Sequence, residues 1–348
     1  MDLDDVDRYA AVDRSDALGD VERTAEQWES ALRTAPAPVD LVGVDAVVCT
    51  GMGGSGIAGG VVRAVAGETF ALPVVVHRGY GVPAFVGSST LVVAFSHSGN
   101  TEETRSAFDE AGRRGARRLL VTSGGALAAA ATDRDTVVRY DPQGRPPRHS
   151  LPSLAVPALA ALGLTDGLDE AVTVLRALAG DHGRHVPTAD NPTKALAARL
   201  AGGAVAMCWG GEGIGAVMAY RLKCQLNENA KLPAGVAVLP EADHNDVVGW
   251  EQPSKLSGVA AVVAVRDRAG EHEQVSRRFT ITLDIVRSQL AFAAELSAVG
   301  TTPVARAASL LLQCDLLSVY TALALDRDPS PVASIDRLKA DLAGVVAG

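Results

Sequence analysis

The sequence predicts an α/β fold in which parallel β-sheets are covered by helices on both faces, as an α-β-α sandwich. Short apolar segments typical of buried strands alternate with longer segments of helical periodicity along most of the chain. The 348 residues are too many for one ordinary domain and suit two domains of about 150 residues each. The alternation also stops midway and then resumes, so we interpret the second half as a diverged copy of the first.

The first half begins with a predicted helix over residues 16–34. Short apolar runs then predict strands that are buried on both faces, as in a parallel sheet. These runs cover residues 45–50, 73–77, 90–95, 118–122 and 136–140. The helical stretches between them cover residues 55–66, 101–114 and 126–131.

A helical linker separates the halves, because the apolar pattern lengthens near residues 164–191 and breaks at Asn191-Pro192. We therefore expect a first domain over residues 1–165, a linker over 166–193 and a second domain over 194–348. The strands expected in the second domain cover residues 204–209, 235–239, 259–266 and 294–299. The helices expected there cover residues 213–227, 272–289, 304–325 and, after a serine cap, 334–342.

The composition argues against several protein classes. With 47% hydrophobic and 21% charged residues, the chain is globular in type and unlike a disordered protein. Its net charge of −9 repels a polyphosphate backbone, so we expect no nucleic-acid partner. The acidic start has no signal-type apolar region, and no run of eighteen apolar residues follows. We expect a cytoplasmic protein with no membrane partner.

A glycine-rich loop follows the first predicted strand and precedes a helix. Residues 51–56, Gly-Met-Gly-Gly-Ser-Gly, match the Gly-x-Gly-x-x-Gly pattern of dinucleotide sites in the context that this pattern requires. A nicotinamide site would need an Asp or Glu at the end of the next strand, where the chain has His77-Arg78-Gly79. Arg78 suits a 2′-phosphate, so the dinucleotide site stays an alternative.

A second loop, residues 95–104, also joins a strand to a helix. It places hydroxyl groups beside backbone amides at a helix N-terminus, which is a combination that binds phosphate monoesters. The alternative is a capping box formed by Asn100 and Glu103, but a cap needs only one such residue. The hydroxyls expected to converge at the ends of the two strands are those of Ser55, Ser96, Ser98 and Thr101. We therefore favour a phosphate site with no cofactor.

The four cysteines are scattered, and no His, Cys or carboxylate group has the spacing of a metal site. We expect reduced thiols and no metal.

The two loops resemble the signature loops of sugar isomerase (SIS) domains. More narrowly, residues 225–231 (Gln-Leu-Asn-Glu-Asn-Ala-Lys) and 243–251 (Asp-His-Asn-Asp-Val-Val-Gly-Trp-Glu) resemble motifs of the bifunctional phosphoglucose/phosphomannose isomerase family. The resemblance runs from about Asp45 to Lys339. It implies two tandem SIS domains and an aldose-ketose isomerase that converts glucose 6-phosphate or mannose 6-phosphate to fructose 6-phosphate.

The resemblance also implies which residues bind the hexose 6-phosphate. The positions that match the sugar-phosphate loops are Gly54, Ser55, Ser96, Ser98 and Thr101. Arg148 matches a further substrate-binding position, with Arg145 as a nearby competitor.

Three catalytic positions follow from the same resemblance. Glu228 matches the base that moves a proton between C1 and C2 through an enediolate. His244 matches the group that opens the sugar ring, which the partner subunit of a homodimer supplies. Lys339 matches a catalytic lysine near the C-terminus by its position. The chemistry needs no metal.

Other functions stay open from the sequence alone. The chain can be a sugar-phosphate sensor or a decayed enzyme, since His149 and Gly60 depart from the family pattern. A sensor usually carries an output domain, and the roughly 40 residues before the first strand are too few and too acidic for one. The motifs of Glu228 and His244 argue against an amino-sugar or pentose phosphate isomerase. The preference between glucose and mannose 6-phosphate is left undecided.

Overall fold

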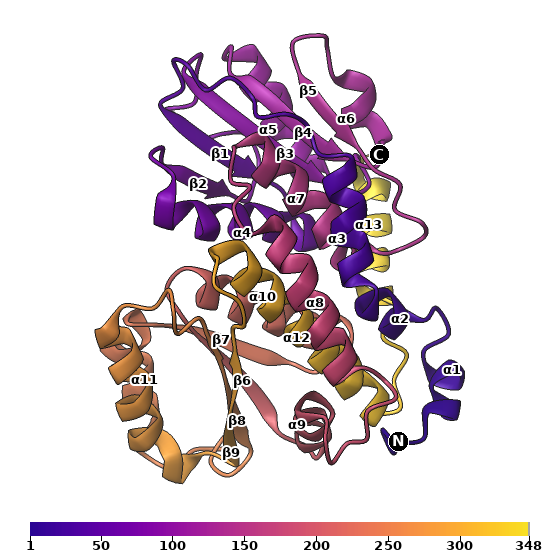
Figure 1. The fold of residues 1–348 in the computed structure, drawn as a ribbon, viewed down its shortest axis with the longest axis vertical. Coiled ribbons are helices and arrows are strands. Elements are labelled where there is room, and N and C mark those ends of the chain that lie inside the picture. Colours follow the sequence, from indigo (N-terminus) through magenta and orange to yellow (C-terminus); the bar gives the residue numbers. More distant parts are fainter. Residues whose placement is uncertain (347–348) are drawn as a thin grey trace.

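The computed structural model describes residues 1–346, which form two parallel β-sheets flanked by helices (Figure 1). In the first sheet the strand order is β2-β1-β3-β4-β5, and each neighbouring pair is parallel. This arrangement confirms the expected parallel sheet of the first half. Its strands are β1 (Ala46–Thr50), β2 (Val74–His77), β3 (Thr90–Ser96), β4 (Arg117–Thr122) and β5 (Thr136–Arg139).

The second sheet repeats this order as β7-β6-β8-β9, again with parallel pairs, and has no counterpart of β5 within residues 1–346. Its last strand begins two residues before the expected start. Phe292 pairs in register with Ala261, and the Arg199 guanidinium stacks on its ring at 3.9 Å. The strands are β6 (Val205–Gly211), β7 (Ala234–Leu239), β8 (Ala260–Arg266) and β9 (Phe292–Ser297).

The helices of the first half differ from the expectation in three places. A short helix over residues 9–12 precedes the first expected helix. The helix expected over residues 16–34 is divided at Arg23, whose backbone leaves the helical conformation. A helix over residues 151–161 was not expected, because every one of its residues is buried and no polar face marks it. The helices are α1 (Tyr9–Val12), α2 (Ala17–Glu22), α3 (Thr24–Arg33), α4 (Gly53–Thr69), α5 (Glu102–Arg113), α6 (Gly125–Ala130) and α7 (Leu151–Ala161).

The segment expected to link the halves contains the helix α8 (Leu168–His182), which packs against α3 and against the long helix α12 (Pro303–Ala324). Asn191, where we expected a break, is the N-cap of a further helix, and its side chain accepts hydrogen bonds from the amides of Thr193 and Lys194. The helices of this half are α8 (Leu168–His182), α9 (Pro192–Ala201), α10 (Ile214–Glu228), α11 (Glu273–Val286), α12 (Pro303–Ala324) and α13 (Ala333–Val346).

Helix α12 is the central element of the core. It packs against α8, α9 and α10 and also contacts α4 of the first half. Its length and composition would suit a membrane span, but 94% of its most apolar window is buried inside the fold. Two charges inside this core are paired, since the Arg221 guanidinium on α10 donates to the Asp315 carboxylate on α12 at 2.6 and 2.8 Å. Helices α10 and α12 are therefore held together by packing and by a buried ion pair.

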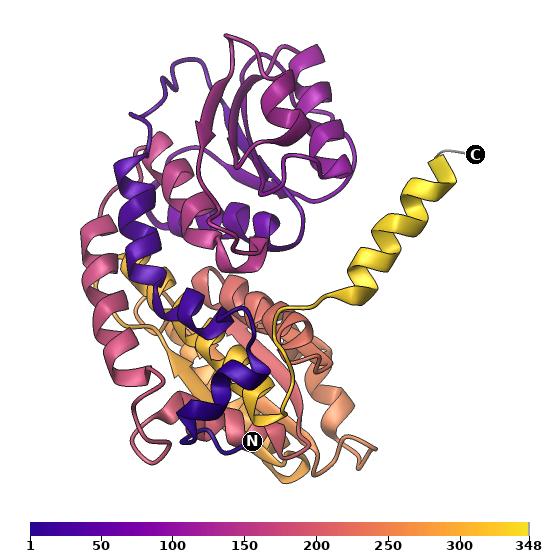
Figure 2. The same ribbon diagram turned by 90° about the vertical axis from the view of Figure 1, so that its right-hand side faces the viewer.

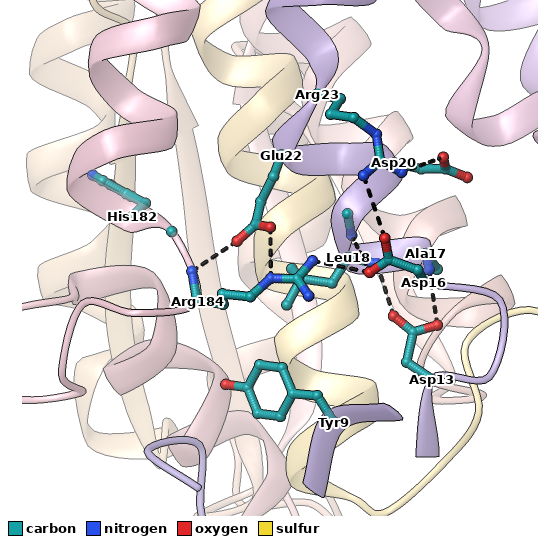
Figure 3. A network of polar contacts seen from close by, with 12 residues as sticks. Tyr9, Asp13, Asp16, Ala17, Leu18, Asp20, Glu22, Arg23, His182 and Arg184 are labelled. Atoms are coloured by element: carbon teal, nitrogen blue, oxygen red, sulfur yellow. Dashed lines mark hydrogen bonds and ion pairs between the residues drawn. The ribbon is translucent and has the colours of Figure 1, made fainter. Parts of the chain in front are cut away.

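The N-terminal helices are fixed to the loop between α8 and α9 by a network of charged groups (Figure 3). The Glu22 carboxylate accepts hydrogen bonds from the backbone amide and Nε of Arg184, both at 2.7 Å. Arg184 also donates to Asp16 at 3.0 Å, and Arg23 joins Asp16 to Asp20. Helix α2 is therefore held against the loop between α8 and α9.

The last helix lies apart from the rest of the chain, as Figure 2 shows. Residues 334–342 of α13, the range expected to be helical, are exposed. The exposed side chains include Ile335, Leu338 and Leu342, which share one face because they are three and seven residues apart.

Candidate functional site

The two glycine- and serine-containing loops lie side by side, because β1 and β3 are neighbours in the sheet and both loops follow their carboxyl ends. The buried Ser55 hydroxyl, in the first turn of α4, accepts a hydrogen bond from the His97 amide of the second loop at 3.1 Å. Within the second loop, the Ser96 hydroxyl accepts from the Gly99 amide at 3.1 Å and donates to the Thr101 hydroxyl at 3.3 Å. These contacts bring the Ser55 hydroxyl against the second loop and join the hydroxyls of Ser96 and Thr101.

The start of α5 is open to a ligand. Thr101 rather than Asn100 is its N-cap, and no side chain of the described residues caps it. The Asn100 side chain instead accepts a hydrogen bond from the Ala126 amide at 2.9 Å, so the alternative of a capping box with Glu103 is wrong. Ser98 is exposed, and its hydroxyl accepts from the Asn100 amide at 3.2 Å. The free amides and hydroxyls at this helix start can bind an anion.

Gly54 lets the first loop approach the segment that follows β5. A Cβ at this position would lie 3.0 Å from the backbone nitrogen of Arg148 and 3.0 Å from the carbonyl carbon of Pro147. Any larger residue would separate α4 from the short helix η2 (Pro147–His149). A side chain here would therefore require the backbone of Pro147 and Arg148 to move by a few tenths of an ångström.

The Arg148 side chain is buried between the two halves of the molecule. Its Nε donates to the Asn229 side-chain oxygen at 2.7 Å, and its Nη2 donates to the carbonyls of Pro329 and Ser330 at 3.0 and 2.7 Å. Its Nη1 lies 3.7 Å from a carboxylate oxygen of Glu228. Burial lowers the pKa of Arg148, and the charge of Glu228 opposes this shift. The guanidinium remains charged at neutral pH.

Glu228 is the last residue of α10, and its carboxylate faces Arg148 with about a quarter of the side chain exposed. The buried Asn229 fixes this helix end, since the nitrogen of its side-chain amide (Nδ2) donates to the Ser318 hydroxyl at 2.9 Å. A partly exposed carboxylate held beside a cation suits proton transfer to a bound ligand.

A further charged residue, which the sequence did not indicate as part of the site, lies beside this pair. The Lys231 ammonium donates to the carbonyls of Asp328 and Asn229 at 2.6 and 3.2 Å. Burial, and then the charge of Arg148, lower the pKa of Lys231 to about 8. The feature of the sequence that could have indicated Lys231 is its position, three residues after Glu228 in the same motif.

His97 and Tyr140 form a second feature that the sequence did not indicate. The His97 Nδ1 lies 2.8 Å from the Tyr140 hydroxyl, which joins the second loop to the segment after β5. Burial, and then the charge of Arg145, lower the pKa of His97. The imidazole is therefore neutral at neutral pH.

His244 lies far from Glu228 of the same chain. It ends η3 (Glu241–His244), which follows the carboxyl end of β7, and it is exposed. The Glu228 end of α10 lies at the other end of this strand, because the Asn227 side chain accepts a hydrogen bond from the Ala234 amide at 3.1 Å. A six-residue strand spans about 20 Å. One chain therefore does not bring these two residues together.

Lys339 is also outside the cluster formed by the other residues. It lies on the exposed helix α13, which projects away from the body of the chain (Figure 2). One chain brings together Gly54, Ser55, Ser96, Ser98, Thr101, Arg148 and Glu228, but neither His244 nor Lys339.

Few of the described residues support a dinucleotide cofactor or a metal ion as the ligand. Arg78, the candidate for a dinucleotide phosphate, donates to the Gly56 carbonyl at 3.3 Å and stacks over the Tyr220 ring at 5.1 Å. Within residues 1–346, no group of three or more His, Cys, Asp or Glu side chains is placed to hold a metal ion.

Comparison with protein families identifies a match over residues 189–342 to the bacterial phospho-glucose isomerase C-terminal SIS domain. A bifunctional phosphoglucose/phosphomannose isomerase of Caldicellulosiruptor bescii is 36% identical over 309 residues, covering 87% of this chain and 91% of that protein. A protein of the same name from Aquifex aeolicus is 32% identical, covering 91% and 94%.

Two further similarities concern a different activity and the fold. A D-glucosamine-6-phosphate 4-epimerase of Sulfolobus acidocaldarius is 32% identical over 232 residues, covering 65% of this chain and 70% of that protein. The crystal structure of a glucose-6-phosphate isomerase like protein from Thermus thermophilus is similar with a TM-score of 0.63 and 19% identity, covering 97% and 98%. At this identity the structural similarity shows the fold alone.

Proposed function

Because the chain belongs to the bifunctional phosphoglucose/phosphomannose isomerase family, we propose that it interconverts glucose 6-phosphate or mannose 6-phosphate with fructose 6-phosphate. The observation that carries this proposal is the Glu228 carboxylate, which faces the buried Arg148 guanidinium at 3.7 Å. Gly54 of the first loop packs directly against the backbone of Arg148. A carboxylate base thus lies next to loops that suit a phosphate monoester.

The reaction needs one base and a stabilised intermediate. With the phosphate bound by the two loops, Glu228 removes the proton from C2 of the open aldose, and the C1 carbonyl becomes part of an enediolate. Glu228 then returns the proton to C1, while the proton of the C2 hydroxyl passes to the C1 oxygen, so that C1 carries a hydroxyl and the C2 oxygen becomes the ketose carbonyl. The positive charge of Arg148 opposes the negative charge that develops on the enediolate oxygens. The planar intermediate allows both aldoses to form the same ketose.

We also propose that the chain acts as a homodimer in which the partner subunit's His244 opens the sugar ring over Glu228. This part rests on the distance of about 20 Å that β7 imposes between the two residues of one chain. His244 is exposed on η3, and Asp243 fixes η3 to α11 by accepting bonds from Arg278 and Thr282 at 3.0 and 2.7 Å. An exposed imidazole on a helix that is fixed in this way suits a role in another subunit. The projecting α13 would likewise carry Lys339 to a partner.

The two sheets are proposed to be two tandem SIS domains, with boundaries at residues 1–165 and 194–348 and the segment 166–193 between them. The repeated strand order of the sheets supports this division. The family match that begins at residue 189 supports the start of the second domain.

A coupled assay of the purified protein tests the proposed activity. Fructose 6-phosphate formed from each aldose phosphate is measured with and without a chelator. We expect turnover of both substrates and no effect of the chelator. Activity that is lost with chelator and restored by zinc would contradict the metal-independent chemistry.

The similarity to the D-glucosamine-6-phosphate 4-epimerase supports a second candidate, inversion at C4 of an amino-sugar phosphate. An epimerase would convert glucosamine 6-phosphate to its C4 epimer and would form no ketose from glucose 6-phosphate. A sugar-phosphate sensor, the non-catalytic alternative, would bind hexose 6-phosphate and turn over neither substrate. Product analysis by NMR separates the three functions.

A further inference from the structure

The segment between Tyr140 and Arg148 connects the two phosphate loops. At its start, the Tyr140 hydroxyl bonds to His97 of the second loop at 2.8 Å. At its end, the backbone of Pro147 and Arg148 packs against Gly54 of the first loop. Arg145 lies between these two anchor points in the chain, and its charge acts on His97 of the second loop.

The Arg145 guanidinium has unused hydrogen-bonding capacity. Its Nη1 donates to the Gln143 side chain at 2.7 Å, and the residue is half-buried. Its Nε is buried and has no hydrogen-bond partner among the described residues. A buried donor without a partner is unfavourable, and a ligand oxygen would satisfy it. The charged groups that influence Arg145 are Asp20, Arg23 and Asp141.

The neighbouring Arg148 has little capacity left for a phosphate. Its Nε and Nη2 donors are bonded to Asn229 and to the carbonyls of Pro329 and Ser330, and its Nη1 faces Glu228. The loops themselves offer hydroxyls, amides and the partial charges of two helix starts, but no full positive charge. A phosphate monoester has close to two negative charges at neutral pH. A guanidinium near the second loop supplies the missing countercharge.

We propose that Arg145 is the cationic ligand of the substrate phosphate, while Arg148 positions Glu228 and contacts the sugar end of the site. This inference rests on the proposed function for the identity of the phosphate ester, but phosphate binding itself is independent of turnover. The bond formed is a charge-assisted hydrogen bond from the guanidinium to a phosphate oxygen, which Lys can replace in charge but not in its paired geometry.

Binding of inorganic phosphate, measured by calorimetry on the full chain, tests the proposal. We expect Arg145→Gln to weaken binding about tenfold or more, because a charge-assisted bond is lost. Arg145→Lys should retain part of the affinity. Arg134→Gln is the matched control, since Arg134 is exposed just before the start of β5, whereas Arg145 follows the other end of this strand. In the isomerase assay, Arg145→Gln should raise KM about tenfold and change kcat less than about threefold.

Each outcome has a defined meaning. Phosphate binding by Arg145→Gln that equals binding by Arg134→Gln overturns the proposal. The proposal is also overturned if Arg145→Gln lowers the thermal stability equally with and without phosphate and leaves the affinity for phosphate unchanged. Arg145 then has a structural role. If Arg145→Gln does not fold, the affinity of Arg145→Lys for phosphate is compared with that of the native protein. Equal affinities overturn the proposal. A native protein that binds phosphate through Arg145 but forms no ketose supports this inference while contradicting the proposed isomerase activity.

Discussion

The guanidinium of Arg148 lies 3.7 Å from the carboxylate of Glu228, although 80 positions of sequence separate the two residues and they belong to different halves of the chain. Arg148 follows β5 of the first sheet, and Glu228 ends the helix between β6 and β7 of the second. The candidate site therefore exists only when the two halves are packed together. Any change that loosens this contact should affect stability and chemistry at once.

Replacing Glu228 by Gln should remove the base and keep the shape of the site. We expect turnover to fall by about a hundredfold or more, the usual effect of losing a general base. Binding of inorganic phosphate should stay close to that of the native protein. Steady-state kinetics and calorimetry check the two parts. The exposed Glu212, at the opposite end of α10, provides the control Glu212→Gln. Turnover that is unchanged in Glu228→Gln would remove this residue from the mechanism.

Replacing Arg148 by Met should destabilise the protein, because the Asn229 side chain and the carbonyls of Pro329 and Ser330 would lose their donor inside the fold. We expect the free energy of unfolding to fall by about 3 kcal/mol. Urea unfolding measures this change. Arg134→Met, at an exposed position, should change the free energy of unfolding by less than about 0.5 kcal/mol. Equal stability of the two variants would show that the Arg148 contacts are not important for folding.

The strands could be predicted because each is a short apolar run that ends in a turn, which is what burial on both faces of a parallel sheet requires. Helix α7 could not, because its residues are buried all round and its sequence has no polar face. The division at Arg23 and the early start of β9 depend on contacts with distant segments, which local periodicity does not encode.

For the site, the residues alone indicated the hydroxyl loops, since the pattern of Ser96, Ser98 and Thr101 exceeds what a helix cap needs. Glu228 and His244 were indicated only by resemblance to a family. Neither the pairing of Lys231 with distant carbonyls nor the bond between His97 and Tyr140 could be predicted, because both join segments that are far apart in sequence. Such contacts follow from tertiary packing.

The combined change of Ser55 and Ser98 to Ala should mainly weaken binding of the phosphate group. Two hydroxyls that can bond to a charged ligand are lost, so we expect binding to weaken by about 1 to 3 kcal/mol. Calorimetry with inorganic phosphate measures this effect. Ser88→Ala, at an exposed position near the other end of β3, is the control. If the native protein bound NADP and no sugar phosphate, the dinucleotide alternative would be right instead.

Lys231 should titrate at lower pH than an ordinary lysine, because burial and the charge of Arg148 lower its pKa to about 8. Above that pH the folded chain loses this proton, while the unfolded chain keeps it until about pH 10.4. The unfolded state then binds more protons, so this group makes the free energy of unfolding rise with pH between these values.

The titration of Lys231 can be followed by its rate of acetylation, quantified by mass spectrometry from pH 7 to 10. We expect Lys231 to reach half of its maximal rate near pH 8, whereas a lysine of the unfolded protein should require a higher pH, about 10.4. A Lys231 profile in the folded protein that matches its profile in the unfolded protein would contradict the lowered pKa.

The arrangement of Glu228 and His244 at opposite ends of β7 makes the proposed dimer testable by mixing inactive variants. In a dimer whose sites combine residues of both subunits, a chain with Glu228→Gln and a chain with His244→Ala form one site with both defects and one site with neither. Each variant alone has a defect in every site. Random pairing gives mixed dimers in half of the cases, so activity should recover to roughly a quarter of the native value.

The same experiment has a clear contrary outcome. If His244 acted on Glu228 of its own chain, every site in the mixture would carry one defect, and verified subunit exchange would restore no activity. The control pairs Glu228→Gln with Arg148→Met, two changes at contacting residues of one chain. A mixed dimer of that pair has no intact site, because each chain damages its own cluster. Activity should therefore recover when Glu228→Gln is mixed with His244→Ala but not when it is mixed with Arg148→Met. This result would show that the partner subunit supplies His244, whereas Glu228 and Arg148 of one site come from the same chain.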